Sequence, residues 1–230
     1  EQLLFNISGV CYKAIGKLNN AVKSFEKALS IKPDYAEAQY NLGVILQELG
    51  QVDAAKESYE KALDIKHEYP NAHNNLGNIF LSRHQLDAAL DHFEWAVAFK
   101  PDFAEAHNNL GVTFQELRQW DESIKSYEKA VEIKPDYAEA YNNLGITYHQ
   151  LLQRDSAVKN YEKAVAIKSN FGTAHHNLSA LKKYTASDPQ ITIMQSLLST
   201  SELSQSDRIH LCFALAKVNE DLGKQDELFK

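Results

Sequence analysis

The chain has 230 residues, of which 44% are apolar, and its formal charge is −7. This acidic balance argues against a general binder of nucleic acids or anionic membranes, because both repel net negative charge. No apolar run approaches the ~18 residues that a membrane span needs. Cys11 and Cys212 stand too far apart for a disulfide framework or a metal-ligand motif, so we expect a reducing compartment, the cytoplasm.

A repeat of 34 residues runs from the start of the chain to residue 171. Three columns of the repeat carry a glycine, an aromatic residue and an alanine. The glycines are Gly9, Gly43, Gly77, Gly111 and Gly145, the aromatics are Phe25, Tyr59, Phe93, Tyr127 and Tyr161, and the alanines are Ala28, Ala62, Ala96, Ala130 and Ala164. Agreement in so many positions, five times over, predicts a repeated structural unit.

Each repeat predicts two amphipathic helices joined by a turn. In residues 36–69, a step of 100° per residue places Leu42, Ile45 and their apolar neighbours on one side of a first helix. Gly50 marks the turn to the second helix. Gly43 allows the two helices to approach closely, and we expect Tyr59 to fill the gap beside it.

Charged residues mark the expected ends of these helices. Before the first helices we expect three capping boxes, Asp34/Glu37, Asp102/Glu105 and Asp136/Glu139. The expected N-caps of the second helices are Asp53, Asp87, Asp121 and Asp155. In the last turn of the second helices, where a cation suits the helix dipole, we expect Lys32, Lys66, Lys100, Lys134 and Lys168.

The repeat pattern breaks after residue 178. Asp188 and Pro189 predict the N-cap and first position of a short helix at about residues 190–199. Ser204 and Asp207 then predict a capping box for a helix that ends at Gly223. We expect one more helix to begin at residue 226.

The repeat columns resemble the tetratricopeptide repeat, whose pattern runs Leu-Gly, aromatic, Ala, aromatic, Ala and Pro. The resemblance covers residues 2–171 as five full repeats and implies half of a sixth, so we expect one array over residues 1–184. Residues 185–206 are then a turn and a short inserted helix, and residues 207–230 an atypical, truncated helical pair. The expected fold is an all-α solenoid of stacked antiparallel helix pairs, and the resemblance implies a right-handed superhelix.

Residues 175–230 are similar to a narrower group, the junction in bacterial tetratricopeptide proteins that continue into a sulfotransferase domain. The similar strings are residues 183–190, 207–211 and 213–217. The catalytic part of that family uses a phosphate-binding loop to hold a sulfated nucleotide, and no Gly-rich loop of this kind occurs in these residues. We therefore expect no catalytic residue, no cofactor and no enzymatic activity in this chain, which lacks an initiator Met and is expected to be a piece of a longer protein.

Asparagines recur with the period of the repeat. One column holds Asn41, Asn75, Asn109, Asn143 and Asn177, and the preceding column holds Asn74, Asn108 and Asn142. On a helical wheel both columns lie opposite the apolar side, on the surface that the resemblance places in a concave groove. A carboxamide donates and accepts hydrogen bonds, so these residues can hold the backbone of an extended peptide, as a similar series does in the O-linked N-acetylglucosamine transferases. The alternative is that they bond between adjacent helices and help to set the superhelical twist; the two roles are compatible.

The rest of this surface indicates the kind of peptide. An apolar strip of Val10, Val44, Val112 and Ile146 is bordered by Glu37, Glu48, Glu105, Glu116 and Glu139. The basic clamp that the family's chaperone-tail binders use is missing from these columns, so we expect an extended segment that is neutral or mildly basic. His73, His107 and His175 share a column that the family fills with Trp, so we expect them to pack and to bind no metal. Trp95 replaces a usual Lys on a second helix and is a candidate exposed contact.

Three functions are compatible with these features. The first is a non-enzymatic scaffold that holds an extended polypeptide in the groove. The second is the substrate-presenting N-terminal arm of a sulfotransferase whose catalytic domain is absent from this chain. The third is a self-assembling array, because Leu3, Leu4 and Phe5 near one end, and Leu228 and Phe229 near the other, are expected to expose apolar area.

Overall fold

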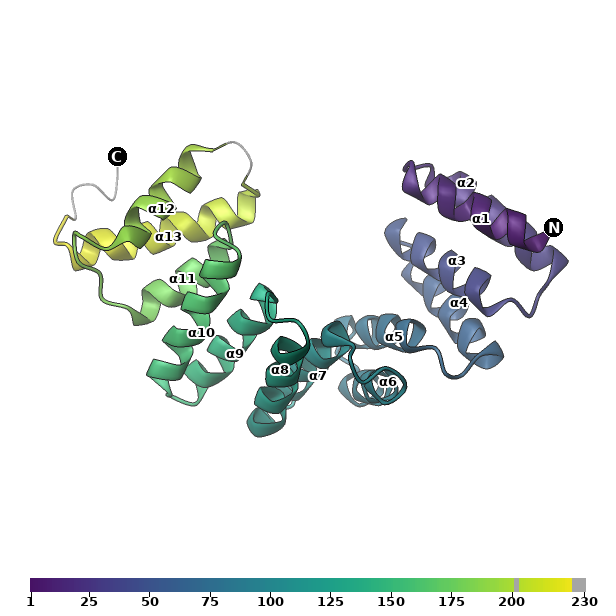
Figure 1. Cartoon of the computed structure of the whole chain (residues 1–230), viewed down its shortest axis with the longest axis horizontal. Coiled ribbons are helices and arrows are strands. Elements are labelled where there is room, and N and C mark those ends of the chain that lie inside the picture. Colours follow the sequence, from purple (N-terminus) through teal and green to yellow (C-terminus); the bar gives the residue numbers. More distant parts are fainter. Residues whose placement is uncertain (201–202, 225–230) are drawn as a thin grey trace. The chain divides into compact units, whose positions relative to one another are not determined.

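A computed structural model describes residues 1–200 and 203–224, and in these ranges the chain forms thirteen α-helices and no strand (Figure 1). The helices are α1 (Gln2–Ala14), α2 (Leu18–Ile31), α3 (Ala36–Glu48), α4 (Val52–Ile65), α5 (Pro70–Ser82), α6 (Leu86–Phe99), α7 (Ala104–Glu116), α8 (Trp120–Ile133), α9 (Ala138–Gln150), α10 (Arg154–Ile167), α11 (Gly172–Leu181), α12 (Pro189–Ser199) and α13 (Gln205–Asp221). The all-α class expected from the repeat is confirmed. Over these same residues, no helix is both long and apolar enough to cross a membrane.

The helices fall into two compact units, Glu1–Leu117 and Arg118–Lys230. In the first unit each helix from α1 to α7 packs against the next one in the chain. The first helices of neighbouring repeats also contact each other, α1 with α3 and α5 with α7. In the second unit α8 to α11 continue the pattern, and α11 then packs mainly against α13, with α12 on the side of α13. The helix inserted after the repeats thus leaves α13 beside α11, where the second helix of a pair would lie.

The glycine and aromatic columns meet inside four helix pairs, as the sequence predicts. A Cβ atom added at Gly43 would lie 2.7 Å from the Tyr59 ring, closer than real Cβ contacts come. The same holds at 2.6 Å or less for Gly9 on Phe25, Gly77 on Phe93 and Gly145 on Tyr161. These aromatic rings are buried, so a side chain at the glycine would displace the largest residue of the local core.

The expected capping boxes of the first helices are wrong. The N-caps of α3, α7 and α9 are the aromatic residues Tyr35, Phe103 and Tyr137, and none of these helices has a side-chain cap. Asp34, Asp102 and Asp136 lie one residue too early, because the turn after each second helix ends with the aromatic residue. The expected caps of the second helices are also wrong. Their N-caps are glutamines, and Asp53, Asp87, Asp121 and Asp155 lie in the first turn, where a carboxylate still suits the helix dipole.

A lysine and an aromatic residue pack together at each junction between repeats. The lysines are the C-cap residues of the second helices, one position beyond the last turn where we expected them. Each ammonium lies 4.7–5.6 Å from an aromatic ring, in the pairs Lys32/Tyr35, Lys66/Tyr69, Lys100/Phe103, Lys134/Tyr137 and Lys168/Phe171. Cation–π contact therefore supports the turn that a side-chain cap was expected to support.

The caps of the last two helices are confirmed. Asp188 is the N-cap of α12 and accepts a hydrogen bond from the backbone N–H of Gln190 at 3.1 Å. Ser204 is the N-cap of α13 and accepts one from the backbone N–H of Asp207 at 3.0 Å. These helices share a core around Tyr184, Met194, Leu211, Ala214 and Val218. The helix expected from residue 226, with Leu228 and Phe229, lies outside the described residues.

Candidate binding surfaces

The two asparagine columns lie at different depths. Asn74, Asn108 and Asn142 are buried, with 2, 8 and 4% of their surface exposed. The residues of the other column are only half-buried: Asn41, Asn75, Asn109, Asn143 and Asn177. The expectation that both columns face outward is therefore wrong for the column of Asn74, Asn108 and Asn142. A wheel drawn for one helix omits the first helix of the next repeat, which covers this side.

Carboxamides of successive repeats bond to one another. Three such bonds join first helices: Asn41 Nδ2 donates to Asn6 Oδ1 at 3.1 Å, Asn109 Nδ2 to Asn74 Oδ1 at 3.0 Å, and Asn177 Nδ2 to Asn142 Oδ1 at 3.0 Å. In each case the half-buried asparagine donates to a buried asparagine 35 residues earlier. This is the bonding between adjacent helices that the alternative role requires.

Asn75 makes a different contact in the first unit. Its Nδ2 donates to the Tyr59 hydroxyl at 3.1 Å, and that hydroxyl donates to Gln47 Oε1 at 2.9 Å. Burial raises the pKa of Tyr59 further above neutrality. The protonated hydroxyl can therefore accept from Asn75 and donate to Gln47 at neutral pH. The carbonyl oxygens of Asn41 and Asn177, by contrast, accept no hydrogen bond from any residue that the structure describes.

Apolar and acidic residues surround the asparagines on the first helices. On α1, Leu3, Ile7 and Val10 are 56, 50 and 47% exposed and form a stripe at positions i, i+4 and i+7. The matching positions of α3 are Glu37, Asn41 and Val44. The face is thus apolar on α1 and polar on the next first helix.

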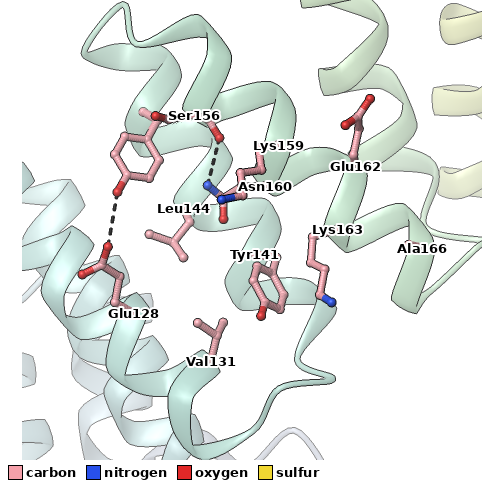
Figure 2. A pocket seen from close by; sticks show the side chains of 11 residues that line it. Glu128, Val131, Tyr141, Leu144, Ser156, Lys159, Asn160, Glu162, Lys163 and Ala166 are labelled. Carbon is pink, nitrogen blue, oxygen red and sulfur yellow. Dashed lines mark hydrogen bonds between the residues drawn. The ribbon is translucent and has the colours of Figure 1, made fainter.

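A second type of surface site, which the sequence analysis did not identify, lies between successive second helices. In the second unit a cavity of about 690 Å³ opens between α8 and α10, with α9 between them (Figure 2). Its lining residues are Glu128, Val131, Tyr141, Leu144, Tyr148, Ser156, Lys159, Asn160, Glu162, Lys163 and Ala166. The Tyr148 hydroxyl donates to Glu128 Oε1 at 3.3 Å, and Lys163 Nζ lies 6.0 Å from the centroid of the Tyr141 ring. We call this cavity the α8–α10 pocket.

The first unit has a pocket at the equivalent positions, two repeats earlier. This cavity of about 360 Å³ is lined by Glu60, Leu63, Asp64, His67, His73, Leu76, Asp91, His92 and Trp95, and we call it the α4–α6 pocket. Trp95 stands in the column of Lys163, and Asp91 stands in the column of Lys159. His73 takes the place of Tyr141. The same frame therefore presents different side chains in the two units.

Aromatic rings dominate the α4–α6 pocket. The Trp95 ring lies edge-on to His67, with centroids 5.1 Å apart, and stacks on Phe99 at 5.4 Å and on His73 at 6.3 Å. Trp95 is 46% exposed, as expected for a contact residue. The same column holds lysine in the four other repeats, as Lys27, Lys61, Lys129 and Lys163.

The two inner histidines of this pocket are uncharged at neutral pH. His73 bonds through Nε2 to the His67 carbonyl at 3.0 Å and through Nδ1 to His92 Nδ1 at 3.0 Å. Since a carbonyl only accepts, the proton of His73 lies on Nε2, and His92 donates to Nδ1. Burial lowers the pKa of His73 to about 4, and burial also lowers the pKa of His92. Neither of these two imidazoles therefore adds charge to the pocket at pH 7.

The histidine column has a packing role in three repeats. His73 and His175 are buried and His107 is half-buried. Each bonds through Nε2 to a backbone carbonyl six residues earlier, at 2.8–3.0 Å. Among the residues that the structure describes, no group of three or more His, Cys, Asp and Glu side chains is placed to hold a metal ion.

Known proteins share this repeat and this arrangement of helices. A tetratricopeptide repeat model matches residues 34–102 and 102–170, and a second model, described as TPR repeat, matches residues 10–50. No curated protein matches the chain.

Three solved structures with a similar arrangement of helices differ in how much of their sequence is identical to this chain. A crystal structure of MamA is 28% identical, with a TM-score of 0.64, over 70% of this chain and 94% of that chain. YrrB, described as a TPR protein with an unusual peptide-binding site, is 24% identical, with a TM-score of 0.65, over 76% and 91%. PilF of Pseudomonas aeruginosa is 16% identical, with a TM-score of 0.72, over 99% and 96%. The likeness to YrrB and PilF concerns the fold.

Proposed function

Because the chain belongs to the tetratricopeptide repeat family, we propose that it is a non-enzymatic scaffold that binds an extended polypeptide along its first helices. The observation that carries the proposal is the half-buried asparagine column. In Asn41 and Asn177 the amide nitrogen is held by a buried asparagine of the preceding repeat, while the carbonyl oxygen accepts no bond from a described residue. YrrB, of the same fold, is described as having a peptide-binding site.

The structural and binding roles of the asparagines support each other in this proposal. The bond to Asn6 or Asn142 fixes the orientation of the half-buried carboxamide before any ligand arrives. Binding then costs less side-chain entropy, because the acceptor is already in place. Backbone N–H groups of an extended segment are suitable donors, since they recur along the segment whatever its side chains.

The surroundings of the asparagines favour a neutral or mildly basic segment with apolar side chains. Leu3, Ile7 and Val10 offer exposed apolar area on α1. Glu37 and Glu48 are exposed on α3, and Glu48 is partly neutralised by Lys13 at 2.9 Å. An acidic segment would meet like charges here, so we place it outside the expected ligands.

The two rival functions have less support. The sulfotransferase arm depends on the resemblance of residues 175–230, and the matched family models end at residue 170. Self-assembly has one observation in its favour, since Leu3 and Leu4 are 56 and 70% exposed. The peptide-binding scaffold accounts for the asparagine column as well, and we place it in the cytoplasm on the composition of the chain.

A binding experiment with matched variants tests the proposal. Peptides selected from a random linear library on the intact chain serve as ligands, and their Kd is measured by calorimetry. Asn41→Ala and Asn177→Ala should each weaken binding about 2- to 13-fold, the equivalent of one hydrogen bond of ~0.5–1.5 kcal/mol. Thermal unfolding of each variant verifies that the helices persist.

Asn6→Ala and Asn142→Ala are the matched controls. They remove the bond between repeats but keep the carboxamide that contacts the ligand, so we expect smaller losses of affinity than in the direct variants. Selected peptides that bind Asn41→Ala and Asn177→Ala as tightly as the unchanged chain would contradict the proposal.

A further inference from the structure

Two repeats contain an internal cation–π contact between columns that hold other residues in the third repeat. Lys27 Nζ lies 4.6 Å from the centroid of the Phe5 ring, and Lys163 Nζ lies 6.0 Å from that of Tyr141. Both lysines belong to one column and both rings to another, at the same separation in the chain. In the third repeat these columns hold Trp95 and His73, whose rings stack with centroids 6.3 Å apart. The α4–α6 pocket thus has an additional ring where other repeats supply their own cation.

The two pockets also differ in the charge of their lining residues. The lining of the α8–α10 pocket holds two lysines and two glutamates, which balance. The lining of the α4–α6 pocket holds Glu60, Asp64 and Asp91 and contains no lysine or arginine. Glu60 is paired with Lys56 at 2.6 Å, whereas Asp64 and Asp91 form no ion pair with any residue in the described part of the chain.

These carboxylates stand on opposite walls of the pocket. Glu60 and Asp64 follow each other at i and i+4 on α4, so they share one face of that helix. Asp91 and Trp95 have the same spacing on α6. An acid and an aromatic ring therefore lie side by side on one wall, and the second acid lies on the other.

We propose that the α4–α6 pocket binds the guanidinium group of an arginine side chain from a partner protein, over the Trp95 ring and between Asp64 and Asp91. A planar guanidinium stacks on an aromatic face and pairs with carboxylates through several N–H donors, which the compact ammonium of lysine does less well. The neutral His73 and His92 add ring area without repelling the ligand. This site lies mainly on the second helices α4 and α6, and none of the asparagines of the first helices lines it.

The first test uses small probes on the intact chain. Nα-acetyl-arginine methylamide is titrated while NMR follows the indole N–H resonances, which the Trp95→Lys variant assigns by removing one of the two. We expect a saturable shift of the Trp95 signal. The citrulline analogue has the same shape without the charge and should bind at least tenfold more weakly. The lysine analogue should bind more weakly than arginine.

The second test restores the residues that other repeats carry. Trp95→Lys and Asp91→Lys place in the pocket the lysines found at positions 163 and 159, so the fold should tolerate them, and each should reduce arginine binding at least tenfold. Trp95→Phe keeps a ring and should retain part of the affinity. Because two of these variants lack the Trp95 indole, calorimetry measures their binding, and circular dichroism checks the helices of every variant.

Several results would overturn the assignment. Equal binding of the citrulline and arginine probes would exclude recognition of charge, and equal binding of lysine and arginine would exclude recognition of the guanidinium. Unchanged affinity in Trp95→Lys would exclude the pocket itself. Because library peptides that bind the first helices should bind Trp95→Lys normally, failure of this proposal is distinguishable from failure of the scaffold proposal.

Discussion

The α4–α6 pocket and the α8–α10 pocket occupy the same positions of the repeat, one in each compact unit, and differ in what they present. Leu76 and Leu144 lie at matching places in the two linings. Lys163 covers an aromatic ring in one pocket, whereas Trp95 adds a ring in the other. The comparison separates two classes of positions: the buried glycine and aromatic columns, which determine how the helices pack, and the exposed columns of residues 91 and 95, which change their chemistry with little consequence for packing.

The buried columns should respond alike in both units. Phe93→Ala and Tyr161→Ala each remove a ring that is buried against a glycine, and each should lower the free energy of unfolding by about 3–5 kcal/mol. Urea denaturation followed by circular dichroism measures the loss. The exposed exchanges Trp95→Lys and Lys163→Trp are the controls and should change it by no more than about 0.5 kcal/mol. A loss at one ring only would show that the two units do not share the packing that their sequences repeat.

The sequence predicts contacts within one repeat better than contacts between repeats. Gly43 and Tyr59 were identifiable as packing partners because their contact lies within one repeat and recurs in others. Asn74 was placed wrongly because its cover comes from the next repeat, which a single-helix wheel omits. The sequence analysis did not identify the α4–α6 pocket, because its lining comes from three helices. On α6, however, Asp91, His92 and Trp95 all differ from the residues that most other repeats have at the same positions. Three unusual residues close together on one helix could have indicated the pocket.

The capping errors have a related cause. Asp34 and Glu37 have the spacing of a capping box, but spacing does not reveal where the turn ends. The structure places Tyr35 at the N-cap and Lys32 Nζ 5.6 Å from its ring. At Ser204 and Asp207 the position of the motif coincides with the N-cap of α13, and there the motif is predictive.

Acid should distinguish the two pockets, because His73 stands where the α8–α10 pocket has Tyr141. Burial lowers the pKa of His73 from 6.5 to about 4, so the unfolded chain takes up a proton at a higher pH than the folded chain. The stability that depends on neutral His73 is complete above pH 6.5 and is lost as the pH falls toward 4, by at most ~1.4 kcal/mol per pH unit and about 3 kcal/mol in total.

His73→Tyr copies the residue of the second unit and should remove this part of the pH dependence. Urea denaturation at pH 7, 6, 5 and 4 compares the variant with the unchanged chain. His92→Ser, which restores the residue of three other repeats, tests the neighbouring ring in the same way. If the unchanged chain and His73→Tyr lose stability in parallel between pH 6.5 and 4, protonation of His73 is not the cause.

Reciprocal exchange of the exposed residues is the sharpest test of the comparison. In the α8–α10 pocket, the double variant Lys159→Asp/Lys163→Trp installs the acid and the ring of the α4–α6 pocket, over the Tyr141 ring that is already present. If exposed columns alone determine the chemistry, this variant should gain a site for Nα-acetyl-arginine methylamide. We expect an affinity at least tenfold above that of the unchanged pocket, equivalent to about 1.4 kcal/mol.

The measurement is made in a Trp95→Lys background, so that the α4–α6 pocket does not contribute. Because Glu128 on α8 already lines this pocket, both walls would then carry an acid. A variant that folds and still fails to bind arginine would show that the smaller α4–α6 cavity, and not its exposed side chains alone, selects the ligand.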